Sequence, residues 1–382
     1  MSEWKEYKLG EVCLKITDGS HNSPPTTTAG YPMASVKDME YNKINLNSCR
    51  TISKEDYQKL VKNDCRPQIN DVLIAKDGSY LKHVFDIVKE EDVVLLSSIA
   101  IIRPNIKKVI SKYLKYIFKN PSFVQLIESN YVTGAVIPRI VLKDFKNIDI
   151  RLPSLPEQRA IASVLSSLDD KIDMLHRQNK TLEALAETLF RQWFVEDAEE
   201  GWGTGKLGDV LELLYGKALK EEIRTGKGFP VIGSSGVVGF HSEFLEKGPG
   251  IVIGRKGTLG KVIYLFDNFF PIDTTYYIKS KVNSVGLFYE YFLLKTLNFE
   301  EMNSDSAVPG LNRDIALSTE IKIAPLDKLN EFNQYCSTLL DKLKANNQQI
   351  RTLTNLRDML LPKLISGQIR IKNLENLNEV TN

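Results

Sequence analysis

The sequence lacks the features of a membrane, disulfide-bonded or metal-binding protein. No apolar run approaches the roughly 20 residues that a helix needs to cross a bilayer. The opening MSEWKEYKLGEV does not have the charged and then apolar layout of a signal peptide, so we expect a cytoplasmic protein without membrane contact. The four cysteines and four histidines are scattered without a CxxC pair, so neither a zinc site nor a disulfide framework is expected.

Strong charge and recognisable catalytic residues are also missing. A formal net charge of +2 over 382 residues is typical of a protein that is not globally basic, so any contact with DNA must depend on local charge or on a partner. An adenine methylase needs Asp or Asn followed by Pro-Pro and an aromatic residue, and NSPPT at 22–26 does not supply this. No nuclease motif of paired carboxylates and a lysine is recognisable, so we expect a chain without catalytic residues.

The sequence does contain an internal repeat. WKEYKLGEV at 4–12 returns as WGTGKLGDV at 202–210, and DVLIAKDGSYLKHV at 71–84 aligns without a gap on GIVIGRKGTLGKVI at 250–263. Further along, VIPRI at 136–140 matches AVPGL at 307–311. Two similar globular domains are therefore predicted.

A long heptad pattern follows each repeated domain. Apolar residues recur with a spacing of about 3.5, which is typical of a coiled coil, and Asn179 interrupts the first pattern while Asn346 and Arg357 interrupt the second. If the helices pair in antiparallel fashion with Asn179 facing Asn346, the two amides satisfy each other and most other layers are apolar. Leu168 then lies opposite Arg357 in the one poor layer. The alternative is that both asparagines lie at the edge of the interface and contact water.

We therefore expect an α+β protein, in which two similar α/β domains are separated by two long helices that form an antiparallel coiled coil with pseudo-twofold symmetry. The expected boundaries are 1–152 for the first domain, 153–198 for the first helix, 199–325 for the second domain, 326–370 for the second helix and 371–382 for a loose tail.

This arrangement resembles the specificity (S) subunit of Type I restriction-modification systems. The resemblance covers almost the whole chain, and the order of its motifs within the duplicated layout makes it specific. The segments that carry it are LPSLPEQRAIASVLSSLDDKID (152–173), LFRQWFVE (189–196), VIGRKGTLGKV (252–262), DTT (273–275), SAVPGLNR (306–313) and LRDMLLPKLISGQI (356–369).

The resemblance implies a non-catalytic subunit with two target recognition domains, each of which reads one half of a split, asymmetric sequence in double-stranded DNA. The helices would set the unread spacer and dock two methyltransferase (M) subunits, which methylate adenine with S-adenosylmethionine. Two restriction (R) subunits, where present, would use ATP and Mg²⁺. The second helix opens with PLDKLNEF at 325–332 and lacks the PxxEQ opening of the first, which weakens the expectation of M-subunit docking there.

The stretch VIGRKGTLGKV raises two alternatives, a phosphate-binding loop and a basic loop that contacts DNA. A nucleotide-binding GxxxxGK loop needs glycine at Arg255 and Ser or Thr at Val262, so that alternative is disfavoured. Basic and hydroxyl side chains at a glycine-rich tip suit contacts to phosphates and guanine edges. The DNA-binding candidates in this loop and in its counterpart are Arg255, Lys256, Thr258, Lys261, Lys76, Ser79 and Lys82.

Other polar loops supply further candidates for DNA contact. These residues are His21 and Asn22 in TDGSHNSP, Ser234 and Ser235 in GSSGVVG, and Arg139, Asn312 and Arg313 after the turns that precede each final strand. A plain structural loop with solvated charges remains the alternative for each of them. For the whole chain, the alternative function is a coiled-coil protein adaptor without sequence-specific DNA binding.

Overall fold

The fold was analysed in a computed structural model, which describes residues 4–77, 82–133, 139–198, 201–282, 286–299, 302 and 310–371. The chain forms two compact units, one of Met1–Asp173 with Arg351–Asn382 and one of Met174–Ile350. Unit 1 and unit 2 each contain one of the two repeated domains and one part of each long helix. The domain boundaries given above stay a prediction.

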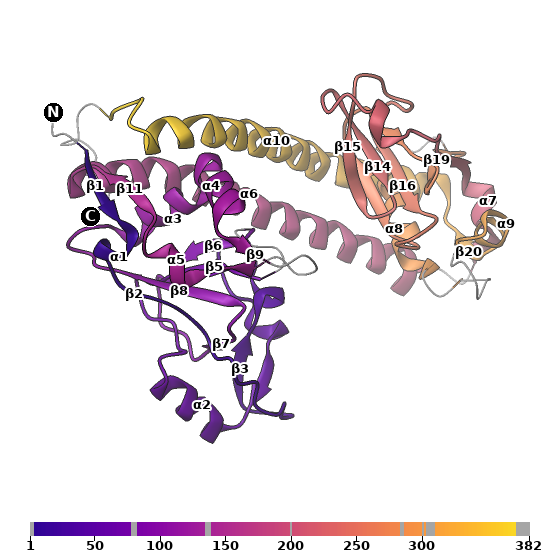
Figure 1. Ribbon diagram of the computed structural model, residues 1–382. Helices are drawn as coiled ribbons and strands as arrows, with labels where there is room; N and C mark the ends of the chain where they lie inside the picture. The colour runs from indigo at the N-terminus through magenta and orange to yellow at the C-terminus, as the bar shows by residue number, and fades with distance from the viewer. Residues whose placement is uncertain are drawn as a thin grey trace. The chain divides into compact units, whose positions relative to one another are not determined.

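Unit 1 contains a four-stranded and a three-stranded sheet. The larger sheet has the order β2 (Cys13–Asp18), β8 (Ile99–Pro104), β5 (Val72–Ala75) and β6 (Val84–Asp86), with all neighbours antiparallel (Figure 1). The smaller sheet has the order β4 (Arg50–Ile52), β3 (Tyr31–Ala34) and β7 (Val94–Leu95), and β3 pairs with β7 in parallel. β1 (Lys5–Lys8) pairs separately with β11 (Asp149–Leu152), and β9 (Val132–Thr133) with β10 (Arg139–Ile140).

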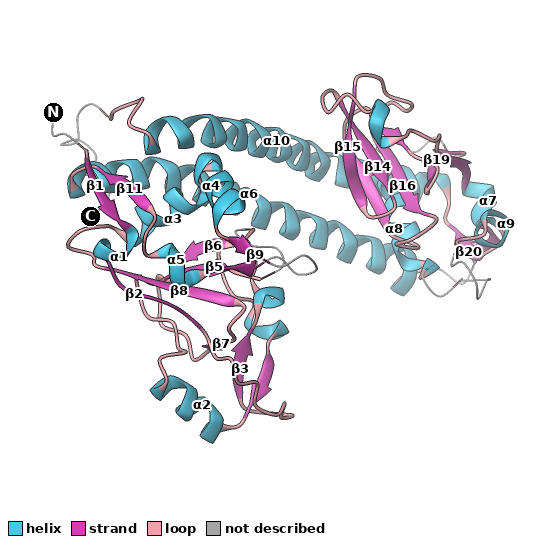
Figure 2. Ribbon diagram, in the orientation of Figure 1, coloured by secondary structure: helices cyan, strands magenta, loops and turns pink. Residues whose placement is uncertain are grey.

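Unit 2 repeats the strand order of both sheets and the pairing of β1 with β11. Its larger sheet has the order β13 (Leu211–Tyr215), β19 (Thr275–Ser280), β16 (Gly250–Gly254) and β17 (Val262–Leu265). Its smaller sheet has the order β15 (Gly236–His241), β14 (Phe229–Gly233) and β18 (Phe270–Pro271), in which β15 and β14 lie side by side (Figure 2). β14 again pairs with the last strand of the sheet in parallel. β12 (Gly203–Lys206) pairs with β20 (Glu320–Ile323) as β1 does with β11. The predicted internal repeat is therefore a repeat of fold.

Short helices complete each unit. Unit 1 contains α1 (Leu9–Val12), α2 (Lys54–Lys62), α3 (Ser111–Lys119), α4 (Pro121–Asn130) and α5 (Leu142–Phe145), and α3 packs on β5, β6 and β8. Unit 2 contains α7 (Leu207–Val210), α8 (Phe288–Thr296) and α9 (Arg313–Leu317), and α8 packs on β17. The structure has no described helix that is both long enough and apolar enough to span a membrane.

The two long helices are α6 (Leu155–Arg191, 37 residues) and α10 (Leu326–Ile365, 40 residues). A short π-helical segment, Gln192–Glu196, continues α6. In unit 1, Ile161 and Leu165 of α6 and Leu361 and Leu364 of α10 join the core of the α/β domain. In unit 2, a second core includes Phe190 of α6, Phe332 and Cys336 of α10 and the inner face of the larger sheet. The heptad residues therefore bury each helix segment against its own domain as well as against the other helix.

The interface between the helices in unit 2 contains the two asparagines. Asn346 Nδ2 donates to Asn179 Oδ1 at 2.9 Å, and Asn179 Nδ2 donates to Asn347 Oδ1 at 3.0 Å. Asn346 is 1% exposed and Asn179 is 8% exposed, so these amides do not lie at a solvated edge. Trp193 and Phe332 also meet, with ring centroids 6.1 Å apart. These contacts fix an antiparallel register for the helix segments in unit 2.

The layer around Arg357 in unit 1 differs from the sequence-based expectation of a poor contact with Leu168. Arg357 Nη1 instead donates to Asp169 Oδ1 at 3.0 Å, and it also contacts Tyr41 Oη. The hydroxyls of Tyr41 and Tyr116 donate to the two oxygens of Asp169 at 3.0 and 2.8 Å. The expectation was wrong because the domain supplies tyrosine hydroxyls, and α6 the adjacent carboxylate, that satisfy the buried guanidinium.

Candidate nucleic-acid interface

In unit 2, residues 255–261 form a tight loop between β16 and β17. Gly254 N–H donates to Lys261 O at 3.0 Å, and Gly260 N–H donates to Gly254 O at 2.9 Å, so the loop closes on the last residue of β16. A Cβ atom at Gly254 would lie 2.0 Å from Thr258 O, which explains why glycine is needed there. The closed loop leaves Lys256, Thr258 and Lys261 exposed.

The turn between β14 and β15 lies against this loop. Lys261 Nζ donates to Ser235 O at 2.6 Å. Gly257 has a φ of +82°, and a Cβ atom there would lie 3.3 Å from Ser234 Oγ. The structure therefore brings together the candidates Ser234 and Ser235 with those of the basic loop. One of the three N–H donors of Lys261 makes this hydrogen bond to the turn, so part of the role of Lys261 is structural.

The segment before α9 forms a third wall of the same cluster. Leu311 N–H donates to Arg255 O at 3.0 Å, and Lys256 forms a β-bridge with Gly310. Asn312 is the N-cap of α9, and its Oδ1 accepts hydrogen bonds from Asp314 N–H and Ile315 N–H at 2.9 and 3.1 Å. This oxygen is therefore occupied by capping, a role that fits the structural alternative for Asn312.

Sequence reasoning missed Tyr215, the last residue of β13. Its side chain is 50% exposed, and its ring centroid lies 4.9 Å from Arg255 Cζ and 5.9 Å from Arg313 Cζ. It also makes an edge contact with Tyr276 at 5.0 Å. Burial, and then the hydrogen bond with Tyr215, raise the pKa of Tyr276, which keeps its hydroxyl protonated for donation to Leu311 O at 3.0 Å.

The corresponding place in unit 1 has the same backbone but different side chains. Ile140 N–H donates to Lys76 O at 3.1 Å, as Leu311 N–H does to Arg255 O, so Lys76 and Arg255 are equivalent. Lys76 is only 5% exposed, because its ammonium group forms an ion pair with Asp18. The expectation that Lys76 contacts DNA is therefore corrected: the side chain balances a carboxylate inside the domain and is not presented at the surface.

The remaining candidates of unit 1 are at the surface around this pair. His21 Nε2 lies 3.3 Å from Asp18 Oδ1, and Arg139 Nε donates to Asp77 Oδ1 at 3.0 Å. Asn22 is exposed, with its N–H bonded to Ser20 Oγ at 3.1 Å, and Lys82 is exposed as well. Ser79 lies outside the described residues. Unit 1 therefore presents a cluster with both acidic and basic groups, in contrast to the arginine and tyrosine cluster of unit 2.

A signal for Tyr215 was present in the repeat. Asp18-Gly19 and Tyr215-Gly216 occupy equivalent positions at the ends of β2 and β13, where a Cβ atom on the glycine would lie 2.2 Å from Leu95 O or 2.1 Å from Ile272 O. The ungapped alignment of the two repeats hides this match, because an irregularity between Cys13 and Lys15 shifts the register of β2 by one residue.

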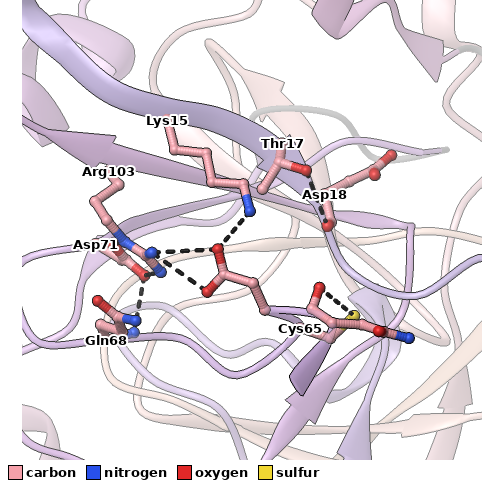
Figure 3. A network of polar contacts seen from close by, with 9 residues as sticks. Lys15, Thr17, Asp18, Cys65, Gln68, Asp71 and Arg103 are labelled. Atoms are coloured by element: carbon pink, nitrogen blue, oxygen red, sulfur yellow. Dashed lines mark hydrogen bonds and ion pairs between the residues drawn. The ribbon is translucent and has the colours of Figure 1, made fainter. Parts of the chain in front are cut away.

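An ion-pair network behind Asp18 holds β2 in place (Figure 3). Arg103 on β8 forms a two-pronged pair with Asp71, with distances of 2.8 and 2.9 Å, and also contacts Asp64, which in turn pairs with Lys15 on β2. Burial alone would raise the pKa of Asp64, but the hydrogen bond from Lys15 and the charge of Arg103 lower it overall. The network therefore remains charged and fixes the strand that carries Asp18 and precedes His21.

The PxxEQ opening of α6 is used inside unit 1. Gln158 Oε1 accepts from Ile110 N–H at 3.0 Å, and Gln158 Nε2 donates to Lys108 O and Pro153 O at 3.1 and 3.0 Å. Glu157 forms an ion pair with Arg370 at 3.1 Å. Glu157 and Gln158 are 6% and 1% exposed, so they attach the helix to its own domain and to the segment after α10.

Comparison with known proteins gives a consistent family match. The family described as "Type I restriction modification DNA specificity domain" matches residues 1–184 and 199–356. A Type I restriction enzyme MjaIX specificity subunit from Methanocaldococcus jannaschii is 27% identical over 70% of this chain and 71% of its own length. A second protein of that organism, the putative Type I restriction enzyme MjaX specificity subunit, is 21% identical over 97% of this chain and 94% of its own length.

A solved structure has the same fold. The crystal structure of a Type I restriction-modification system S subunit from M. genitalium superposes with a TM-score of 0.60 and 22% identity, and the match covers 95% of this chain and 96% of that one. The α+β architecture with two sheet domains and two long helices is therefore shared with a protein of this kind.

Proposed function

Because this chain belongs to the family of Type I restriction-modification DNA specificity domains, we propose that it is the DNA-recognition subunit of such a complex and reads a split, asymmetric target. The observation that carries this proposal is one backbone frame with two different sets of side chains. Unit 1 places Lys76 and Asp18 where unit 2 places Arg255 and Tyr215. Two equal frames with unlike side chains suit two unlike half-sites.

The cluster in unit 2 has the composition that DNA contact requires. Exposed Lys256 and Lys261 can neutralise phosphates, and the hydroxyl of Thr258 can donate to phosphate oxygens. The loop that carries them is fixed by its own backbone hydrogen bonds, so little conformational entropy is lost on binding. Arg139, His21, Asn22 and Lys82 supply the corresponding surface in unit 1.

The long helices are the proposed docking surface for two methyltransferase subunits. In unit 2 the helices expose large apolar side chains, which a partner protein would cover. These are Leu185, Leu326 and Tyr335, which are 48%, 59% and 60% exposed. In unit 1 the first turns of α6 border a groove of about 700 Å³, lined in part by Ala160, Ser163 and Ser167. Small side chains there permit close approach of a partner backbone.

The chemistry is assigned to the partners. The relatives are named specificity subunits, which agrees with a recognition role for this chain. We propose that the M subunits bind S-adenosylmethionine and methylate adenine, and that R subunits, where present, use ATP and Mg²⁺. This chain would position the target and would hold none of these groups itself.

The test is a genome-wide map of methylated adenine in the source cell, in a strain that lacks this gene and in the same strain after the gene is restored. We expect one split motif, with two unlike half-sites around a fixed gap, to disappear and return. If the partner subunits are present and active and no motif changes, the chain is a coiled-coil adaptor and the proposal fails.

A further inference from the structure

The exposed tyrosine of unit 2 lies near two arginines, one after β16 and one at the start of α9. Tyr215 is 50% exposed, and both Arg255 Cζ and Arg313 Cζ lie within 6 Å of its ring centroid, at 4.9 and 5.9 Å. At these distances a guanidinium group is attracted to the ring face. Aromatic residues and arginine are enriched at binding interfaces, so a half-exposed tyrosine beside two arginines is a candidate contact.

Arg255 is held in a single orientation from both its backbone and its side chain. Its N–H donates to Thr274 O at 2.9 Å, and its carbonyl oxygen accepts from Leu311 N–H at 3.0 Å. Its Nη1 donates to Asp273 O at 3.0 Å. Because an arginine fork has five N–H donors, these contacts orient the group and leave donors for a ligand.

Arg313 contacts the ring of Tyr215, but one of its side-chain donors lacks a hydrogen bond among the described residues. It is the first residue of α9, and its Nε is buried without a hydrogen-bond partner among the residues that the structure describes. A buried donor without a partner disfavours the free protein. A ligand that brings an acceptor to this guanidinium, and lets it reorient toward that acceptor, would relieve this.

We infer that Tyr215, Arg255 and Arg313 form a site that reads a guanine edge in the half of the DNA target bound by unit 2, an inference that rests on the proposed function. Guanine presents two acceptors, O6 and N7, in the major groove, and the arginine fork matches them. A guanidinium fixed against an aromatic ring and a carbonyl oxygen keeps the planar orientation that this contact needs. A phosphate contact does not need such a fixed plane, and the exposed Lys256 of the same loop is better suited to it.

The equivalent place in unit 1 differs in its described side chains. Lys76 stands there in place of Arg255 and is buried in its ion pair with Asp18, and the exposed Arg139 nearby is paired with Asp77. The inferred guanine contact is therefore specific to one half of the target, and the other half serves as an internal control.

The first experiment leaves the protein unchanged. The full chain is assembled with its methyltransferase subunits, the methylated motif is determined, and binding is measured to duplexes in which each guanine in turn is replaced by 7-deazaguanine, which lacks the N7 acceptor. We expect the substitution at one position in one half-site to weaken binding by about 5-fold or more, because it removes one of the two acceptors of the bidentate contact and leaves O6. If 7-deazaguanine weakens binding at no position of either half-site, the inference is overturned.

Variants then assign that position to this cluster. Arg255→Met removes the guanidinium and Tyr215→Leu removes the ring, so each complex should no longer distinguish guanine from 7-deazaguanine at the sensitive position. Tyr215→Phe keeps the ring and is the matched control, which should still distinguish them. All three should retain recognition of the other half-site, which also shows that the variants are folded.

The outcomes separate this inference from the proposed function. If the wild-type complex methylates a split motif and Arg255→Met still distinguishes the two bases, the guanine site is refuted while the proposed function stands. If Arg255→Met weakens binding equally to all sequences and reduces its salt dependence, the contact is to phosphate and the inference also fails. A wild-type complex that methylates no split motif overturns both.

Discussion

Replacing Arg357 by methionine should destabilise unit 1 strongly. Arg357 Nη1 donates to Asp169 at 3.0 Å, and the Asp169 side chain is only 3% exposed. Burial by itself would raise the pKa of Asp169. The charge of Lys119 and the hydrogen bonds from Arg357 and Tyr116 nevertheless lower it overall, so the carboxylate is charged in the folded state.

The expected magnitude follows from what Arg357→Met leaves behind. Asp169 would keep its hydrogen bonds from Tyr41 and Tyr116 and the charge of Lys119 nearby, but would lose the guanidinium that pairs with it directly. Breaking one side of a buried ion pair costs about 3–5 kcal/mol. The double variant Asp169→Asn, Arg357→Met removes both charges and should recover most of this loss, because the amide can still accept from a tyrosine hydroxyl.

The penalty should depend on pH with a defined sign. In the wild type the pKa of Asp169 is depressed, so its contribution to stability is present above the unfolded pKa of about 4 and is lost as the pH falls through the folded value. In Arg357→Met, burial should raise the pKa of Asp169, which then protonates more readily. The difference in stability between wild type and variant should therefore shrink below pH of about 4.

Amide hydrogen exchange measured by mass spectrometry suits this test, because the two units need not unfold together. Protected amides of α3, which carries Tyr116, should exchange faster by about 150-fold or more in Arg357→Met, and amides of α8 in unit 2 should change little. Unchanged protection of α3, or a double variant as unstable as the single one, would refute the assignment of stability to this pair.

Three further changes test other parts of the structure. Asn346→Leu leaves the Asn179 side-chain oxygen without its hydrogen-bond donor, so urea denaturation should show unit 2 less stable by about 1–3 kcal/mol. Adding Asn179→Leu should restore stability. A single variant as stable as the wild type would contradict the pairing. Gly254→Ala would place a methyl group 2.0 Å from a carbonyl oxygen, so methylation of the target should be lost, whereas Gly203→Ala, which has open space around it, should keep activity as the matched control. Lys76→Met leaves the partly buried carboxylate of Asp18 without its ammonium partner and should lower the stability of unit 1 by about 1–3 kcal/mol in a thermal melt, with an unchanged melting temperature counting against the ion pair.

Much of the architecture was predictable because it is written in local periodicity. A repeated pattern of apolar strands and glycines predicts repeated domains, and the two domains do share one strand order. A spacing of about 3.5 residues predicts a coiled coil whatever surrounds it. Asn179 and Asn346 could be matched because a costly buried amide selects its partner within an otherwise apolar pattern.

The side-chain chemistry of the site was decided by the tertiary structure. Lys76 and Arg255 look alike in the aligned repeats, yet Lys76 is buried because Asp18 from another strand neutralises it, whereas Arg255 meets the exposed ring of Tyr215. Likewise Arg357 is an unexpected charge in the apolar heptad pattern, and the structure shows that it contacts Asp169 and Tyr41. A sequence encodes the period of each element, but the partner of a charge depends on which distant segments the fold brings within a few ångströms, and no spacing along the chain contains that information.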